Sequence, residues 1–152
     1  MEPSEHDRRV LGLVHTALLA SIGVYGIVLM FFRSEVAPES RHSGSGLTLF
    51  VLFAALGAAQ FAGTALVGKL LLRSSRAGAR DRVRLYFLLR AAAAEAIALY
   101  GLVLGFLGVP PAPVVALFAM AVAALFACFP GRGPWEEATR IAEGRSAGDA
   151  KR

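Results

Sequence analysis

The chain has 152 residues, of which 56% are hydrophobic, and it carries a formal net charge of +5. The apolar residues gather in stretches of about 20, the length that crosses a membrane as a helix, so too little polar sequence is left for a separate soluble domain. The single cysteine, Cys128, excludes an intramolecular disulfide and a cysteine-based metal site.

Four apolar stretches predict an all-α membrane protein, with four transmembrane helices arranged as two helical hairpins. The predicted spans are residues 10–32, 47–72, 85–108 and 112–129, which together form one membrane domain over residues 10–129. Residues 1–9 form a polar N-terminus, and residues 130–152 form a polar tail. In this tail we expect a short interfacial helix from Trp135 to Glu143, with Trp135 at headgroup level, and then a disordered end.

Basic residues are concentrated before the first span, between the second and third spans, and after the fourth. The first connection has only Arg33 and Arg41, balanced by Glu35 and Glu39, and the third connection has no charge. The positive-inside rule therefore predicts that both termini and the loop at 73–84 are cytoplasmic. Because this charge follows membrane topology, it does not indicate nucleic-acid binding, and the expected partners of the loop are anionic membrane lipids. We predict a multi-pass protein of the bacterial inner membrane.

Glu95 is an ionisable residue in the middle of the third predicted span. A charged group at this depth costs roughly 3 kcal/mol on insertion scales, so such residues are rare and are functional candidates. Burial disfavours the charged form of a carboxyl. Two roles follow: the carboxyl binds and releases an ion, or it is a neutral acid that hydrogen-bonds a neighbouring helix.

The second predicted span carries a row of small residues and one polar side chain. Ala55, Ala59 and Gly63 recur every four residues, a spacing that lets helix backbones approach closely in lipid. The row indicates either ordinary helix packing or a tightly packed inner ring of identical helices. Gln60 lies at a similar depth to Glu95, because the two residues are almost equally far from the turn between their spans. Its amide is either a partner of the carboxyl or a structural interhelical hydrogen bond.

Part of the first span recurs in the third at an offset of 75 residues. Residues 21–32 match residues 96–107, most clearly at a shared Tyr-Gly pair. The match suggests two related helical hairpins. At the same offset Ala20 takes the place of Glu95, so we expect only the second copy to carry charge chemistry.

The second and third spans together resemble a known family. The string from Ala55 to Leu70, the Arg-rich loop and the string from Ala94 to Val103 are similar to the proteolipid subunit c of rotary ATP synthases, over roughly residues 50–108. In that family a glycine-rich inner helix and an outer helix form a hairpin, and many hairpins assemble into a membrane ring. A carboxylate on the outer helix binds and releases H⁺ or Na⁺ as the ring rotates.

The resemblance implies that Glu95 is the ion-binding carboxylate, that Gln60 takes part in ion coordination and that Tyr100 braces the site. Ala96 stands where the Na⁺-binding pattern has a hydroxyl residue next to the acid, so the expected ion is H⁺. The loop lacks the Arg-Gln-Pro or Arg-Asn-Pro triplet with which the family engages the rotor stalk. Coupling to an ATPase head is therefore left open.

Arg90 is a second charged residue inside the third span. It precedes Glu95 by five residues, which is about 140° around a helix, so the two do not form a favourable intrahelical pair. Arg90 either snorkels to the cytoplasmic interface or acts as a modulator of Glu95, by pairing with an acid on another helix or subunit. His15 holds the equivalent position in the first span, which favours an interfacial depth for both.

The sequence shows no nucleophile–base pair, phosphate-binding loop or cluster of metal ligands, so we expect no enzyme, no cofactor and no metal. The leading interpretation is a subunit-c-like proteolipid that exchanges H⁺ at Glu95 within a homo-oligomer or a larger rotary-ATPase-type complex. In that case the chain is at most a non-catalytic, ion-translocating subunit. The alternative is a non-translocating membrane scaffold or accessory subunit. A transporter of small solutes comes third, because one carboxylate and one glutamine form a sparse site.

Overall fold

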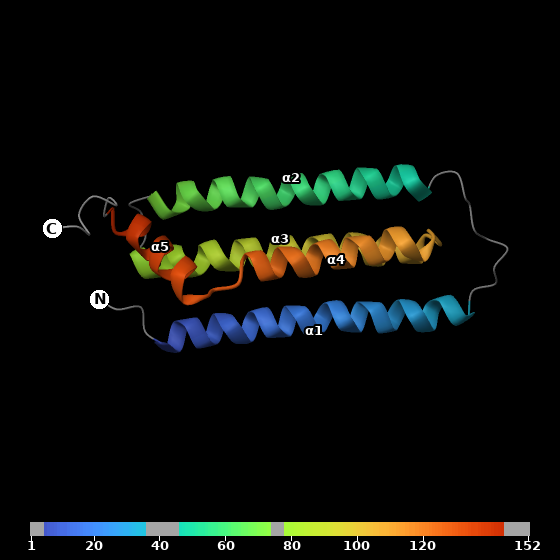
Figure 1. The fold of residues 1–152 in the computed structure, drawn as a ribbon, viewed down its shortest axis with the longest axis horizontal. Coiled ribbons are helices and arrows are strands. Elements are labelled where there is room, and N and C mark those ends of the chain that lie inside the picture. Colours follow the sequence, from blue (N-terminus) through green and yellow to red (C-terminus); the bar gives the residue numbers. More distant parts are fainter. Residues whose placement is uncertain (1–4, 36–45, 74–77, 145–152) are drawn as a thin grey trace.

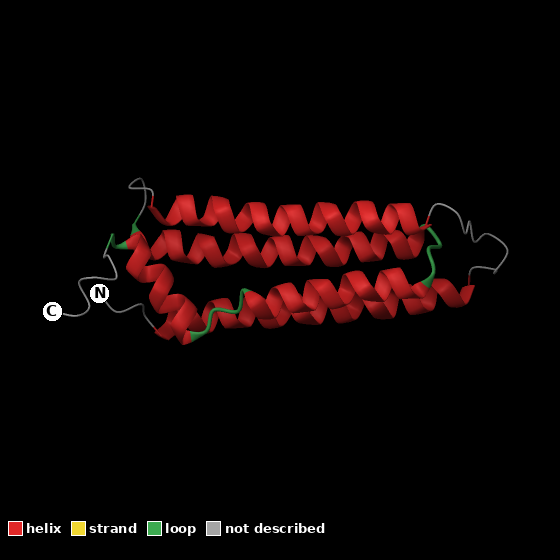
Figure 2. Ribbon diagram, turned by 45° about the horizontal axis from the view of Figure 1, so that its top comes forward, coloured by secondary structure: helices red, strands yellow, loops and turns green. Residues whose placement is uncertain are grey.

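The computed structural model describes residues 5–35, 46–73 and 78–144, and all regular structure in this part of the chain is helical (Figure 2). The helices are α1 (Glu5–Glu35), α2 (Gly46–Arg73), α3 (Ala79–Phe106), α4 (Pro111–Ala127) and α5 (Arg132–Ala142). The predicted all-α class is therefore confirmed for the described residues.

Helix α3 lies at the centre of the bundle (Figure 1). It packs against α1, α2, α4 and α5, whereas the described residues of α1 and α2 lie on opposite sides of it and make no contact with each other. Consecutive long helices run in opposite directions, so α2 and α3 form an antiparallel pair, as do α3 and α4. This arrangement differs from the predicted first hairpin, because α1 packs on α3 and α4 instead of on α2.

The turn between α3 and α4 is built from glycine and proline. Gly108 has a φ of 74°, a left-handed conformation that ends the helix without the steric cost of a Cβ. The N–H groups of Gly108 and Val109 donate to the carbonyl oxygens of Gly105 and Leu104 at 3.2 Å each, which is the Schellman pattern of a helix C-terminus. Pro111 then begins α4, where its fixed φ suits the first helical position and its missing N–H is not needed.

Three helices are long and apolar enough to cross a membrane: the Arg9–Arg33 part of α1, α2 and α3. A fourth span results if α4 and α5, which meet at a bend of 64°, are taken together. On its own α4 has 17 residues, a length of about 26 Å at the rise of an α-helix, against a hydrocarbon core of about 30 Å. The long apolar helices indicate a membrane-spanning protein.

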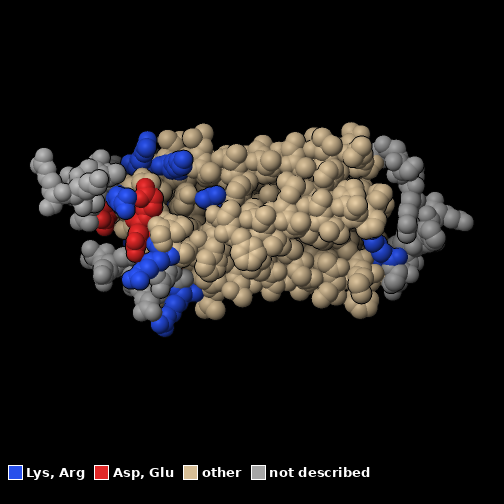
Figure 3. Space-filling view, in the orientation of Figure 1, with Lys and Arg blue, Asp and Glu red and all other residues tan. Residues whose placement is uncertain are grey.

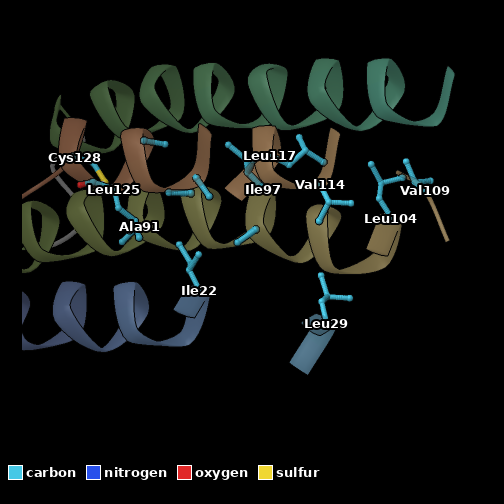
Figure 4. Close-up of a cluster of buried hydrophobic side chains, with 14 residues drawn as sticks. Ile22, Leu29, Ala91, Ile97, Leu104, Val109, Val114, Leu117, Leu125 and Cys128 are labelled. Carbon is cyan, nitrogen blue, oxygen red and sulfur yellow. The ribbon is translucent and has the colours of Figure 1, made fainter. Parts of the chain in front are cut away.

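The main hydrophobic core lies along α3, where α4 and α1 pack against it (Figure 4). Its fully buried members are Ala94, Ala98, Leu104, Leu117 and Ala121. Small residues on α3 let its neighbours come close, and a Cβ added to Gly101 would lie 3.2 Å from the Phe118 ring of α4. Close packing of this kind takes the place of the hydrophobic drive that helices in lipid lack.

Charged side chains gather at the ends of the bundle, and the side seen in Figure 3 is largely uncharged between them. Basic residues are most numerous at the end that holds the start of α3 together with α5, which we call the charged end. Large apolar side chains on the outer faces of α1 and α2 are exposed, among them Leu13, Met30, Leu47 and Leu70. An apolar belt between two polar ends is the surface that a bilayer requires.

Helix α5 lies against α3 and α2 at the charged end. Trp135 stacks on Phe87 of α3 with ring centroids 5.5 Å apart, and it is 3% exposed. The Arg82 guanidinium donates to the carbonyl oxygen of Ala142 at 2.8 Å. A short helix was expected here, but its tryptophan is enclosed by protein, so it fixes α5 to α3 instead of facing headgroups. The predicted disordered end at 145–152 lies outside the described residues.

Candidate functional site

The carboxyl of Glu95 is turned from α3 toward α1. Its Oε1 atom accepts a hydrogen bond from the Tyr25 hydroxyl at 3.0 Å and lies 3.2 Å from Ser21 Oγ. Ser21 and Tyr25 are four residues apart, so they share one face of α1. Glu95 itself is half-buried. Two hydroxyls of one helix therefore hold the acid of another.

The Ser21 hydroxyl can act toward Glu95 either as a hydrogen-bond acceptor or as a donor. Its Oγ atom lies 2.7 Å from the carbonyl oxygen of Leu18, closer than it lies to Glu95. A hydroxyl donates one proton and can accept two hydrogen bonds. When Leu18 takes the Ser21 proton, a neutral Glu95 can donate its own proton to Ser21 Oγ. When Ser21 turns its proton to Glu95, an ionised carboxylate is satisfied instead, so both states of the acid have partners.

Gln60 and Tyr100 are paired with each other and not with Glu95. The Tyr100 hydroxyl donates to Gln60 Oε1 at 2.8 Å, which joins α3 to α2, and the Tyr100 ring stacks on Phe53 at 5.3 Å. Tyr100 follows Glu95 by five residues, about 140° around the helix, so the two side chains meet different neighbours. The three residues predicted to form one ion site thus belong to two hydrogen-bonded groups, one toward α1 and one toward α2.

Ser21 and Tyr25, which were not predicted as site residues, both lie in the 75-residue repeat. Tyr25 and Tyr100 occupy equivalent positions, and each donates its hydroxyl proton to a polar side chain of a neighbouring helix. Ser21 is equivalent to Ala96, so the hydroxyl that is missing beside the acid in sequence is supplied by α1 in space. The repeated Tyr-Gly pair was the signal that pointed to Tyr25.

The predicted packing row on α2 faces away from the other described helices. Ala55, Ala59 and Gly63 are all exposed, and a Cβ added to Gly63 would meet no atom within 4 Å. The row does not pack within the chain, because it lies outside the face that α2 turns to α3. Its contact with identical helices stays a prediction.

Helix α2 approaches α3 closely through two other glycines. A Cβ added to Gly57 would lie 2.9 Å from Ile97, and one added to Gly68 would lie 2.5 Å from the Tyr86 ring. Both distances are shorter than a carbon–carbon contact of about 3.5–4.0 Å. Gly57 and Gly68, rather than the predicted row, are the small residues on which the α2–α3 pair depends.

Arg90 makes its contacts on the side of Tyr86, one turn nearer the charged end. Its Nη1 donates to the Tyr86 hydroxyl at 3.1 Å, and its guanidinium carbon lies 4.9 Å from the centroid of the Phe61 ring. It forms no hydrogen bond or ion pair with Glu95, nor an ion pair with any other described acid. The Arg90 side chain thus points toward the charged end of the bundle, as a snorkelling arginine does. Modulation of Glu95 by Arg90 stays a prediction without a contact in its support.

His15 and Cys128 are both 1% exposed and lie against each other, with Nε2 and Sγ 3.7 Å apart. His15 Nδ1 is 3.0 Å from the carbonyl oxygen of Leu11, which favours the tautomer that carries its proton on Nδ1. Nε2 is then free to accept from the thiol. His15, the counterpart of Arg90 in the repeat, is thus enclosed by protein, and Cys128 is a buried residue that packs against it.

Asp7 forms an ion cluster with Arg80 and Arg84 that no pattern in the sequence indicates. Its fully buried carboxylate accepts hydrogen bonds from Arg80 and Arg84 of α3, with Arg80 Nη2 at 2.6 Å from Oδ1. The hydrogen bond from Arg80, aided by Arg84 and by the charges of both, holds the pKa of Asp7 well below its usual range, although burial acts in the opposite direction. The cluster ties the N-terminus of α1 to the first turns of α3.

We expect Asp7→Asn to lower the free energy of unfolding by about 2 kcal/mol at neutral pH. Hydrogen bonds to charged groups contribute roughly 1.5–3 kcal/mol each, and the value is reduced because Arg80 and Arg84 are partly exposed. The folded-state pKa of Asp7 is depressed, so the stabilisation is present above the unfolded value of about 3.9. It is lost as the pH falls below that value toward the folded pKa.

Thermal unfolding in detergent, followed by the emission of the single tryptophan, measures this difference. Wild type and Asp7→Asn should converge as the solution is acidified. Glu136→Gln, at an exposed acid in a 3.5 Å pair with Arg132, is the matched control and should unfold like wild type. An Asp7→Asn protein as stable as wild type at neutral pH would contradict the role given to the cluster.

Comparison with known proteins finds no match to the chain among protein families, curated proteins or solved structures. Within the described residues, no group of three or more His, Cys, Asp or Glu side chains is placed to hold a metal ion.

Proposed function

We propose that the chain is a subunit-c-like membrane proteolipid that binds and releases H⁺ at Glu95 within an oligomeric, rotary-ATPase-type assembly. The observation that carries this proposal is a half-buried carboxyl near the middle of a long apolar helix, in contact with two hydroxyls of a neighbouring helix. The chemistry is a single step in which the O–H bond of the neutral acid breaks and a proton leaves for water or a basic group.

The hydroxyls of Ser21 and Tyr25 can hydrogen-bond Glu95 both as a neutral acid and as a carboxylate. Tyr25 donates to the carboxyl oxygen in either state, and Ser21 accepts from the acid or donates to the carboxylate. An ionised carboxylate without donors would be costly in an apolar setting, whereas one that accepts hydrogen bonds is far less so. Glu95 is only half-buried, so the protein chain does not enclose it on every side.

The same proposal includes the topology. Helices α1, α2, α3 and α4 would be the four spans, and α5, which follows α4 after a bend of 64°, would belong to the cytoplasmic tail. By the positive-inside rule the charged end would face the cytoplasm, which puts both termini there, and the protein would be a multi-pass component of the bacterial inner membrane. The start of α1 and all of α5 lie at this end (Figure 1), as one cytoplasmic side for both termini requires.

A second function, a non-translocating membrane scaffold or accessory subunit, is favoured by a different observation. The bonds from Tyr25 to Glu95 and from Tyr100 to Gln60 join α3 to α1 and to α2. Interhelical hydrogen bonds of this kind each stabilise a membrane bundle by about 1 kcal/mol or less. In this function Glu95 is a permanently neutral acid, and its role is to hold α1 in position against α3.

The mass of the intact assembly distinguishes the two functions. The protein is extracted in a mild detergent or in native lipid discs and weighed under native conditions. A ring predicts one dominant species whose mass is a multiple of the 16.0 kDa chain. A single chain, or a small complex with unlike subunits, would contradict the motor and support the scaffold.

A further inference from the structure

The basic residues that the sequence suggested as lipid ligands are mostly occupied by protein. Arg80 and Arg84 bind Asp7, and Arg82 donates to the carbonyl oxygens of Leu72 and Ala142 at 2.6 and 2.8 Å. These three side chains hold α1, α2, α3 and α5 together at the charged end. A lipid phosphate would have to displace those contacts, so the lipid site has to be sought elsewhere.

Arg90 is a half-buried basic residue, and the described residues use little of its hydrogen-bonding capacity. Of its five N–H groups, one on Nη1 reaches the Tyr86 hydroxyl, while Nε is buried without a partner. The guanidinium carbon lies 4.9 Å from the Phe61 ring centroid and 5.7 Å from that of Tyr86. Aromatic faces stabilise a cation, but they accept few hydrogen bonds. Among the described residues, Arg90 therefore has no anion of the kind that a guanidinium in an apolar setting needs.

The C-terminal end of α4 supplies only part of the negative charge that Arg90 requires. The charge of Arg90 acts on the Cys128 thiol, at the C-terminal cap of α4. A helix C-terminus carries roughly half a negative charge, spread over its last carbonyl groups. Three of the last four carbonyl oxygens already accept hydrogen bonds, those of Ala124 and Leu125 from the N–H of Cys128 and that of Phe126 from the N–H of Phe129. The described part of the chain therefore supplies no full counter-charge to Arg90.

A second basic residue lies one turn nearer the charged end than Arg90, on the side to which the Arg90 side chain points. Gly68 is in contact with the Tyr86 ring, so Lys69, the next residue of α2, lies at the level of Tyr86. Lys69 is exposed, and the described residues offer it no ion pair. Arg90 lies six residues inward from Arg84, about 9 Å along α3. That is a depth from which a long side chain reaches the edge of a hydrocarbon core.

We propose that Arg90, assisted by Lys69, binds the phosphate group of a membrane phospholipid. The planar guanidinium matches the geometry of a phosphate, and its Nη groups keep N–H bonds that Tyr86 does not use, whereas the buried Nε lies out of a lipid's reach. Phe61 and Tyr86 then supply apolar contacts for the glycerol and the first carbons of the lipid chains. The site is independent of proton exchange at Glu95, which Arg90 does not contact.

Binding of dioleoyl-phosphatidylglycerol to the purified chain, titrated in detergent and counted by native mass measurement, tests this site. Arg90→Gln should bind the lipid about tenfold more weakly, as expected for the loss of a charge-assisted bond. Lys69→Gln should bind it a few-fold more weakly, and Arg90→Lys should lie between Arg90→Gln and wild type. Arg132→Gln removes an equal charge from a side chain that is 84% exposed, and it should bind like wild type.

Two further ligands identify the source of the phosphate. Dioleoylglycerol has the same chains without phosphate and should not be retained, and inorganic phosphate at the same concentration should not displace the lipid. Retention of dioleoylglycerol, displacement by inorganic phosphate, or equal lipid binding by wild type and Arg90→Gln would each overturn the proposal. If the emission of Trp135 shows that Arg90→Gln is misfolded, the exposed Lys69→Gln variant decides: equal binding by that variant and wild type then overturns the site.

Discussion

Gly68→Leu is expected to lower the free energy of unfolding by about 2 kcal/mol, whereas Gly63→Leu on the same helix should change it by no more than about 1 kcal/mol. At Gly68 the first added carbon would already lie 2.5 Å from the Tyr86 ring, whose hydroxyl accepts a hydrogen bond from Arg90 that a shift of the ring would disturb. At Gly63 the same carbon would meet no atom within 4 Å. The two variants therefore add identical groups to a packed face and to an open face of α2.

Thermal unfolding in a single detergent, monitored by helical circular dichroism, compares the two proteins with wild type. If Gly68→Leu is as stable as Gly63→Leu, the result would contradict a close contact between α2 and α3 at Tyr86. The native mass of Gly63→Leu adds a second result. If identical α2 helices pack through Ala55, Ala59 and Gly63, this variant should keep its fold and lose its assembly.

The positions of the helices along the chain could be predicted from hydropathy and from helix-ending residues, because both signals lie in the local sequence. The long apolar stretches determine where α1, α2 and α3 run. Gly108 and the prolines that follow mark the turn before α4, and the break after Cys128 separates α5. In α3 the helix begins earlier than the predicted span, at Ala79, because the arginines of its first turns have partners in the protein.

The neighbours of each helix could not be predicted in the same way. Helices that are apolar on all sides carry little information about which face meets which partner. Equal depth suggested that Gln60 and Glu95 meet, yet residues at one depth can point in different directions around α3, and Tyr100 takes Gln60 instead. The position of α1 against α3 is fixed by long-range contacts, such as those of Asp7 and Tyr25, that no local pattern shows.

Glu95 should be the carboxyl that a hydrophobic carbodiimide modifies in the folded protein. The reagent attacks protonated carboxyls in apolar surroundings, and Glu95 combines an apolar helix with partial exposure. Asp7 is buried and held ionised by two arginines, so it should not react. Glu95→Gln should reduce labelling to background, while Glu136→Gln, which removes an exposed acid, should leave it unchanged.

The pH dependence of that labelling tests proton exchange at Glu95 most directly. Peptide mass analysis of the purified protein, treated over a series of pH values, gives the rate of modification at Glu95. A carboxyl that releases its proton predicts a rate that is high in acid and falls as the pH rises. A rate that does not change with pH in the folded protein would show a permanently neutral acid, and no modification at any pH would show a permanently charged one. Either result would contradict proton exchange at this site.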